Sequence, residues 1–125
     1  VKDNHLMVKG AAADLPNSIQ SMKNDHPRVA VQLEADTLEQ VETFIGMNEV
    51  DYLLLDNMDN DTLRRAVAIR GDRKRPVLEA SGGVNLETVR GIAETGVDCI
   101  SVGELTHSAA ALDLALDFVP FQETF

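Results

Sequence analysis

The stretch VLEASGGVNLETV, residues 77–89, contains the pattern that decides the fold. It begins as an apolar run, passes through Ser81-Gly82-Gly83, and continues into a segment headed by Asn85, a favourable helix N-cap residue. A strand, a glycine turn and a helix in this order form the repeating unit of parallel α/β proteins. The stretch therefore raises the question of whether the same unit recurs along the chain.

Apolar runs rich in Val, Ile and Leu alternate with helical patterns over most of the sequence. The runs predict strands buried on both faces, as in a parallel sheet. Thr37 and Gln40 have the spacing of a capping box, Asp59 or Asn60 can cap the following helix, and Gly96 is a suitable residue to end another. The predicted strands are residues 29–35, 50–56, 75–81 and 98–103, and the predicted helices are 37–47, 61–69, 85–96 and 108–118, with a weaker one at 17–25.

The predicted strands end at regular intervals. The ends fall near Glu34, Asp56, Ser81 and Gly103, which are 22, 25 and 22 residues apart. Such short βα units are typical of a TIM-like α/β barrel, although a complete eight-unit barrel takes about 250 residues. The fold class is therefore α/β with consecutive parallel βα units, as half a barrel, a small open sheet or part of something larger. The chain starts at Val1 rather than Met, and we expect residues 1–125 to be one portion of a larger barrel domain.

Charge and composition narrow the function classes. The formal net charge of −10 disfavours duplex nucleic acid and anionic membranes as partners. The sequence has no apolar segment long enough to span a membrane and no apparent leader, so we expect a cytoplasmic protein. Cys99 is the single cysteine and lies within the apolar run VDCISVG, which excludes an internal disulfide and predicts a buried thiol.

Polar residues and glycines follow the predicted strands directly. Functional residues of parallel α/β folds gather at the carboxyl ends of strands, so we expect these residues to share one edge of the sheet. Glu34 and Asp56 would then face a common space, where they can bind Mg²⁺, accept hydrogen bonds from sugar hydroxyls or stabilise positive charge; alternatively, each caps or pairs locally. The candidate positions at these strand ends are Lys2-Asp3-Asn4-His5, Glu34, Asp56-Asn57, Ser81-Gly82-Gly83 and Gly103 to His107.

The glycines at two neighbouring strand ends have two readings. Ser81-Gly82 before the predicted Asn85 helix, and Gly103 before His107, resemble the paired phosphate corners of many barrels. Glycine permits close approach of a ligand to the backbone, but it equally serves a tight turn without any ligand. Lys2 can likewise be a cation for an anionic substrate or a salt-bridge partner of Glu34.

Six motifs in this order resemble the C-terminal part of the quinolinate phosphoribosyltransferase family, also called carboxylating nicotinate-nucleotide pyrophosphorylases. The resemblance covers nearly the whole chain. The motifs are KDNH at 2–5, LEADTLEQ at 33–40, LLLDNM at 53–58, LEASGGVNLETV at 78–89, AETGVD at 93–98 and SVGELTHSAAALDLALDF at 101–118.

The resemblance implies an enzyme that converts quinolinate and phosphoribosyl pyrophosphate to nicotinate mononucleotide, pyrophosphate and CO₂ with Mg²⁺, in NAD biosynthesis. It implies an open α/β barrel after an N-terminal domain, assembled into homodimers or larger oligomers. Lys2 would contact quinolinate and the phosphoribosyl donor, while Glu34 and Asp56 would hold the ribose hydroxyls and the metal-bound donor. The residues that would bind phosphate are Ser81, Gly82, Gly103 and His107.

The sequence also departs from the family pattern. Gln32 stands where relatives often have Glu, and Glu104 stands where they usually have a small residue, close to the expected phosphate site. The family's arginine pocket for quinolinate lies upstream of KDNH, so we expect these 125 residues alone to be inactive. Two alternatives stay open: a different phosphate-binding barrel enzyme acting on a sugar phosphate, and a non-catalytic half-barrel that serves as an interaction module.

Overall fold

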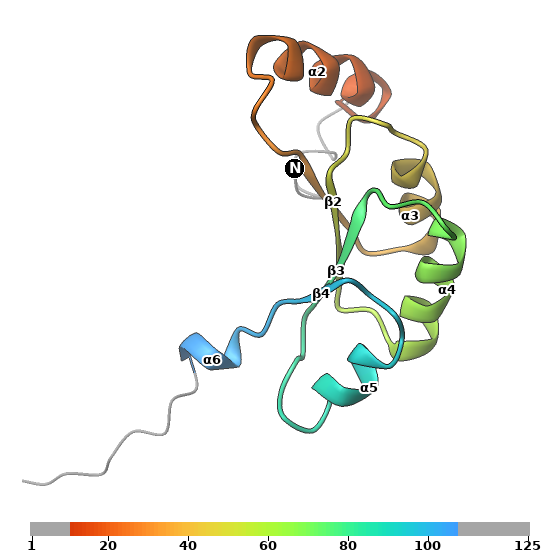
Figure 1. Cartoon of the computed structure of the whole chain (residues 1–125), viewed down its shortest axis with the longest axis vertical. Coiled ribbons are helices and arrows are strands. Elements are labelled where there is room, and N and C mark those ends of the chain that lie inside the picture. Colours follow the sequence, from red (N-terminus) through yellow and green to blue (C-terminus); the bar gives the residue numbers. More distant parts are fainter. Residues whose placement is uncertain (1–10, 108–125) are drawn as a thin grey trace, which may run out of the picture.

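The computed structural model describes residues 11–107, and it contains one four-stranded parallel sheet with the order β1-β2-β3-β4 (Figure 1). Each strand pairs with the next along the chain, so every crossover links adjacent strands. The strands are β1 (Gln32–Ala35), β2 (Tyr52–Asp56), β3 (Val77–Ser81) and β4 (Cys99–Ile100). The helices are α2 (Ala11–Asp25), α3 (Leu38–Ile45), α4 (Asn60–Arg70), α5 (Val89–Ala93) and α6 (Glu104–His107). The predicted alternation of parallel βα units is confirmed.

Local capping explains where α3 and α4 begin. The Thr37 side chain accepts a hydrogen bond from the Gln40 N–H, and the Gln40 side chain accepts from the Thr37 N–H, which completes the predicted capping box. Of the two candidate caps for α4, Asp59 performs the role, with 2.7 Å between its Oδ1 and the Thr62 nitrogen. Both helices therefore start where short-range hydrogen bonding favours them.

The predicted helix at 85–96 is wrong at its start. Asn85 Oδ1 accepts hydrogen bonds from the N–H groups of Glu87 and Thr88, so the chain forms a side-chain-stabilised turn before α5 begins at Val89. The predicted end is wrong as well, because α5 stops at Ala93 with Glu94 as its C-cap. Gly96, with a positive φ of 92°, lies in the turn two residues past that cap rather than directly after it. The predicted helix at 108–118 lies outside the described residues.

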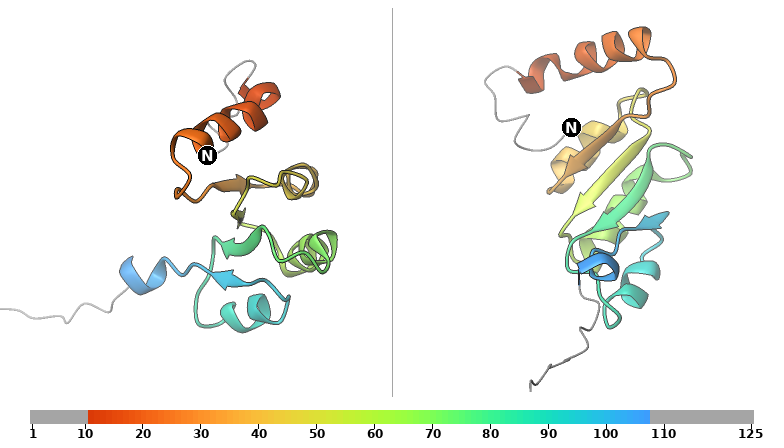
Figure 2. Two further views of the ribbon diagram at one scale, coloured as in Figure 1. Left: turned by 45° about the horizontal axis from the view of Figure 1, so that its top comes forward. Right: turned by 90° about the vertical axis from the view of Figure 1, so that its left-hand side faces the viewer.

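The two faces of the sheet differ in what covers them. Figure 2 shows α3, α4 and α5 on one side of the sheet. Leu33, Leu53, Leu55 and Leu78 are at most 1% exposed, and they belong to one core cluster with buried residues of these helices. The residues between them are half-buried or exposed, and on β2 Tyr52 is 39% exposed. The prediction of strands buried on both faces is therefore wrong for the described residues, because helices cover only one face. We call the other face the open face.

Cys99 illustrates the same difference. It belongs to β4, but it is exposed rather than buried. An apolar run predicts burial only if something covers both sides of its strand, and in the described part of the chain nothing covers the open face at β4.

Two aspartates, the buried Asp51 and the exposed Asp98, stabilise the end of the sheet opposite the strand carboxyl ends. Asp51 is 8% exposed, and its Oδ2 accepts from the Val31 N–H at 2.9 Å and from Lys23 at 2.5 Å, while Arg75 pairs with its Oδ1. Burial raises the pKa of Asp51, but the hydrogen bonds from Lys23 and Val31 and the charges of Lys23 and Arg75 together hold it below its usual value. Asp51 thereby connects α2 to the starts of β1 and β3.

Asp98 repeats this arrangement one strand pair later. Its Oδ2 accepts from the Leu78 N–H at 2.8 Å and pairs with Arg70 of α4. In both cases an aspartate just before one strand binds a backbone N–H at the start of its neighbour, which fixes the register of the pair.

Candidate functional site

The predicted site residues of β2 and β3 lie side by side at the carboxyl edge of the sheet. Asp56 is the last residue of β2 and Ser81 the last of β3, and the two are register partners. Glu34 of β1 pairs with Leu54, so it stands on the same face as Asp56 and one pleat below it. The parallel sheet thus brings Glu34, Asp56 and Ser81 to one region, as expected from the sequence.

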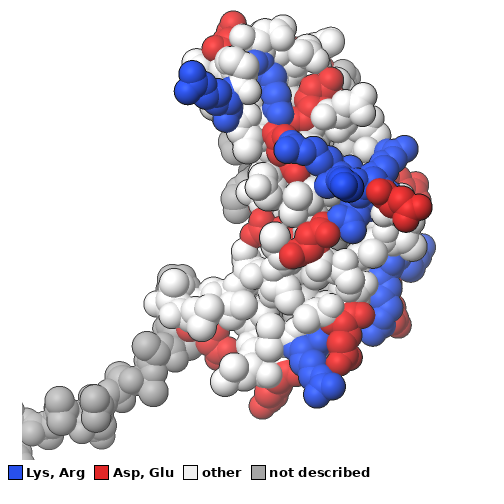
Figure 3. Space-filling view, in the orientation of Figure 1, with Lys and Arg blue, Asp and Glu red and all other residues white. Residues whose placement is uncertain are grey.

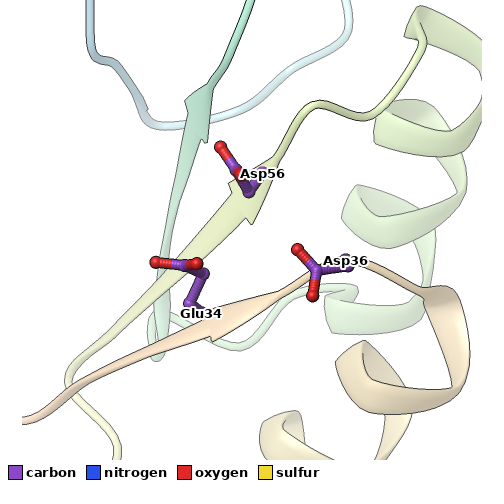
Figure 4. A group of neighbouring side chains, drawn as sticks. All are labelled: Glu34, Asp36 and Asp56. Atoms are coloured by element: carbon purple, nitrogen blue, oxygen red, sulfur yellow. The ribbon is translucent and has the colours of Figure 1, made fainter. Parts of the chain in front are cut away.

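Three carboxyl groups form a cluster at this edge (Figure 4). Glu34, Asp36 and Asp56 each offer a carboxylate oxygen, and these oxygens all lie within 4.8 Å of one another. Hard divalent cations such as Mg²⁺ prefer oxygen ligands, and carboxylates are foremost among them. The donor set therefore fits such a cation, and it also fits hydrogen bonding to vicinal sugar hydroxyls.

Asp36 is the member that the sequence reading missed. It follows β1 directly, and one further step along the β1–β2 register sets it opposite Asp56. The signal was present in the sequence, because Asp36 is two residues beyond Glu34 and residues two apart on a strand share a face.

The loops after β2 and β3 touch each other, and this contact requires a glycine at position 82. Asn57 has a positive φ of 53°, and its N–H donates to the Ser81 carbonyl at 2.8 Å. Gly82 has a φ of 89°, and a Cβ built there would lie 2.8 Å from the Asn57 nitrogen. The glycine thus allows the backbones to approach closely, and the contact holds Asp56 next to Ser81.

The second expected phosphate corner is only partly described. Gly103 directly precedes α6 and is exposed. Its carbonyl accepts hydrogen bonds from the N–H and the hydroxyl of Thr106, which lies within α6. His107 is the last residue of α6, and its side chain lies outside the described part of the molecule, as does Lys2. The sequence predicts a phosphate at the N-terminus of a helix that begins at Asn85, where the helix dipole would attract it. In the structure α5 starts only at Val89 and has five residues, so the helix dipole does not support a phosphate next to Asn85.

A groove runs beside this corner, between the turn before α5 and α6. Leu86 and Leu105 line it and are 92% and 81% exposed, and Glu87 and Glu104 bring negative charge to it. Glu104 therefore lies close to the expected phosphate corner, as inferred from the sequence.

Comparisons with known proteins agree with these features. The family model described as quinolinate phosphoribosyl transferase, C-terminal domain, matches residues 1–117. The nicotinate-nucleotide pyrophosphorylase [carboxylating] of Mycobacterium leprae is 37% identical over 118 residues, which cover 94% of this chain and 40% of the relative. The chain thus spans about two fifths of the length of that relative.

Solved structures support the same assignment. The nicotinate-nucleotide pyrophosphorylase from Francisella tularensis superposes with a TM-score of 0.73 at 30% identity, covering 92% of this chain and 38% of that one. Thiamine phosphate pyrophosphorylase from Pyrococcus furiosus gives a TM-score of 0.61 at 24% identity over 73% of this chain and 46% of that one, a likeness of fold alone. The described sheet and helices are half of a TIM-like barrel, and its open face is the inner face of that barrel.

Proposed function

The chain belongs to the quinolinate phosphoribosyl transferase family, and we propose that it forms the C-terminal half-barrel of an enzyme that makes nicotinate mononucleotide. The substrates would be quinolinate and phosphoribosyl pyrophosphate, and the other products pyrophosphate and CO₂, as a step of NAD biosynthesis. The observation that supports this proposal most is the carboxylate cluster of Glu34, Asp36 and Asp56 beside Ser81, in a chain of this family.

The carboxylates suit the chemistry of ribose transfer. Departure of pyrophosphate from C1 of the ribose leaves an oxocarbenium-like centre, and preorganised negative charge nearby stabilises it. In this proposal Glu34 and Asp56 are the catalytic residues, and they also hold the ribose hydroxyls. Because the donor spans from ribose to phosphates, the same carboxylates keep C1 in a fixed position for attack by the pyridine nitrogen.

Mg²⁺ is the cofactor that the cluster would hold. Glu34 and Asp56, with Asp36 as a third oxygen donor, would bind the ion directly or through the metal-bound donor. When bound, the ion would neutralise charge on the pyrophosphate.

The remaining expected contacts concern anions. Ser81, Gly82 and Gly103 offer exposed or half-buried positions at consecutive strand ends, where phosphate oxygens can approach the backbone and the serine hydroxyl closely. His107 would close this corner, and Lys2 would contact quinolinate and the donor.

Several of the described arginines have partners away from the proposed site. Arg70 pairs with Asp98, Arg75 pairs with Asp51, Arg73 donates to the Ile45 carbonyl and Arg90 pairs with Glu94. Figure 3 shows basic side chains on the outer helices and on the loops at the opposite end of the sheet. We therefore expect residues 1–125 alone to be inactive, and a homodimer or larger oligomer of the complete protein, in the cytoplasm, to carry the activity.

The test is release of CO₂ from carboxyl-labelled quinolinate by the complete gene product. The proposal expects release that requires phosphoribosyl pyrophosphate and Mg²⁺ and that yields nicotinate mononucleotide. A well-folded complete protein that releases no CO₂ under these conditions would refute it.

A different phosphate-binding barrel enzyme is the second candidate, because the Ser81–Gly82 and Gly103 corners suit any sugar phosphate. Ligand-induced stabilisation separates the two. Quinolinate with the phosphoribosyl donor should raise the unfolding temperature of the complete protein beyond the effect of ribose 5-phosphate. An equal rise with ribose 5-phosphate alone would favour the second candidate.

A non-catalytic half-barrel is the third possibility that the sequence left open, and the open face favours it. Such a half-barrel module would bind a partner through the open face, and it would show no CO₂ release in the same assay.

Within the described residues, no helix has the length and apolar character that crossing a bilayer requires.

A further inference from the structure

One carboxylate links three strands across the open face. Glu79 of β3 accepts a hydrogen bond from Gln32 of β1 through Oε2, at 2.8 Å from the Gln32 Nε2. Its other oxygen, Oε1, accepts from the hydroxyl of Ser101, which directly follows β4. We call Gln32, Glu79 and Ser101 the Glu79 bridge.

The bridge runs diagonally across the open face into the proposed site. Glu79 is level with Leu54 and therefore with Glu34, Gln32 lies one pleat lower beside Tyr52, and Ser101 follows the Ala80–Ile100 pair at the level of Ser81. Side chains two residues apart on a strand share a face and are about 6.6 Å apart along the strand. Each member of the bridge precedes a proposed site residue by two positions: Gln32 precedes Glu34, Glu79 precedes Ser81, and Ser101 precedes Gly103.

The Glu79 bridge crosses β2, the strand between β1 and β3. On β2 the register partner of Glu79 is Leu54, an apolar residue. The hydrogen bonds of the backbone ladder connect β1 to β3 through β2. The Glu79 bridge adds a direct polar link between β1, which carries Glu34, and β3, which carries Ser81.

The bridge matters most for β4, the last strand of the described sheet, because it adds a hydrogen bond that attaches the end of this strand to β3. β4 consists of Cys99 and Ile100 only, and beyond it the Ser101 N–H donates to the Ala80 carbonyl at 2.9 Å. The Ser101 hydroxyl on Glu79 adds a second attachment just before Gly103. Without it, the segment leading to Gly103 would depend on very few hydrogen bonds to β3.

We propose that Glu79 is a positioning residue that sets the distance between the ribose corner, at Glu34 and Asp56, and the phosphate corner, at Ser81 and Gly103. The inference rests on the proposed function, because the donor must touch both corners at once. A rigid link between the corners matters, since a displacement of about 1 Å in a catalytic constellation can reduce the rate by about 100-fold.

The bridge should affect activity far more than stability. Its hydrogen bonds are exposed in the described half-barrel, and they lie on the inner face of the complete barrel. On that face the cost of desolvating the Glu79 carboxylate offsets much of what its hydrogen bonds contribute, so an apolar side chain of similar size should change the free energy of unfolding little. A large loss of rate without a loss of stability is therefore the expected sign of its role.

Three substitutions in the complete protein test this inference. Glu79→Met removes both acceptor oxygens at similar size, Glu79→Gln retains an acceptor for Ser101 and a polar partner for Gln32, and Cys99→Ser is the matched control. Cys99 is the register partner of Glu79 and takes no part in the bridge. The measurements are kcat and KM for the phosphoribosyl donor and the urea midpoint.

The inference expects kcat/KM of Glu79→Met to fall by about 30-fold or more, mostly in kcat, with an unchanged urea midpoint. Glu79→Gln should stay within about 3-fold of the unsubstituted protein, because it keeps the links, and Cys99→Ser should match that protein. If Glu79→Met does not fold, Ser101→Ala replaces it, with an expected loss of about 5-fold, since one link of two remains.

The outcomes separate the two claims. An unsubstituted protein without activity refutes the proposed function and the bridge with it. An active protein in which Glu79→Met, or Ser101→Ala in its place, equals Cys99→Ser overturns the bridge alone. Equal large losses in Glu79→Met and Glu79→Gln would also overturn it, because they would mean that the negative charge itself acts on the substrate.

Discussion

Replacing Gly82 with alanine should damage the site more than its φ angle alone predicts. Gly82 has a φ of 89°, and the added Cβ would lie 2.8 Å from the Asn57 nitrogen and 2.9 Å from its Cα. Both atoms belong to the backbone, so they cannot rotate away, and the loop after β2 must move. Because the Asn57 N–H donates to the Ser81 carbonyl, this movement separates Asp56 from Ser81.

Gly96 provides a control with the same backbone strain and no clash. Its φ is 92°, and a Cβ there would meet Val67 Cγ1 at 3.5 Å, an ordinary contact. Gly96→Ala should therefore show the cost of the left-handed conformation alone, about 1–2 kcal/mol in the free energy of unfolding. Gly82→Ala adds the steric conflict, which overpacking series place at about 1–3 kcal/mol, for a total of about 2–5 kcal/mol.

The two variants should separate further in activity. We expect kcat/KM of Gly82→Ala to fall by about 100-fold, because a shift near 1 Å between the two corners has that effect, while Gly96→Ala keeps the unsubstituted value. Urea unfolding and steady-state CO₂ release on the complete protein measure both quantities. Equal stabilities of the two variants, or an unimpaired Gly82→Ala enzyme, would refute the reasoning about the Asn57 contact.

Two further predictions concern charge. Asp51 has a lowered pKa in the folded protein, so it stabilises the fold above the unfolded pKa near 3.8, and this contribution disappears as pH falls below that value. Asp51→Asn should therefore lose about 1–3 kcal/mol at pH 7 and show a weaker loss of stability on acidification, whereas an unchanged pH profile would argue against the ion pairs with Lys23 and Arg75. Glu104→Ala should tighten binding of inorganic phosphate by about 3-fold in calorimetry, because it removes negative charge beside the Gly103 corner; unchanged or weaker binding would separate Glu104 from the phosphate site.

Short-range signals predicted the elements that depend on short-range forces. The Thr37–Gln40 box and the Asp59 cap formed as expected, since their hydrogen bonds involve residues three apart. The start of α5 was misplaced because Asn85 has two competing uses, a helix cap and a turn, and the sequence does not say which has the lower energy.

Features that depend on distant contacts were predicted less well. Gly82 suggested either a turn or a ligand, but its steric need arises from Asn57, 25 residues earlier, and only the packed loops reveal it. The aspartates before β2 and β4 were overlooked, although Val50-Asp51 and Val97-Asp98 repeat the same dipeptide just before a strand. The burial of strands was overestimated because an apolar run carries no information on how many of its faces are covered.

Glu34 and Asp56 are proposed to act on the ribose of a phosphoribosyl donor. The most direct measurement is single-turnover CO₂ release by the complete protein and by its Asp56→Asn variant, with Asp61→Asn as control. Asp61 is an exposed aspartate of α4 that pairs with Arg64. Its replacement by asparagine also removes one negative charge, but at a position outside the proposed site.

Asp56→Asn should slow the single turnover by about 100-fold or more with an unchanged unfolding midpoint, whereas Asp61→Asn should react at the unsubstituted rate. A folded Asp56→Asn protein that reacts as fast as Asp61→Asn would mean that the Asp56 carboxylate takes no part in ribose transfer.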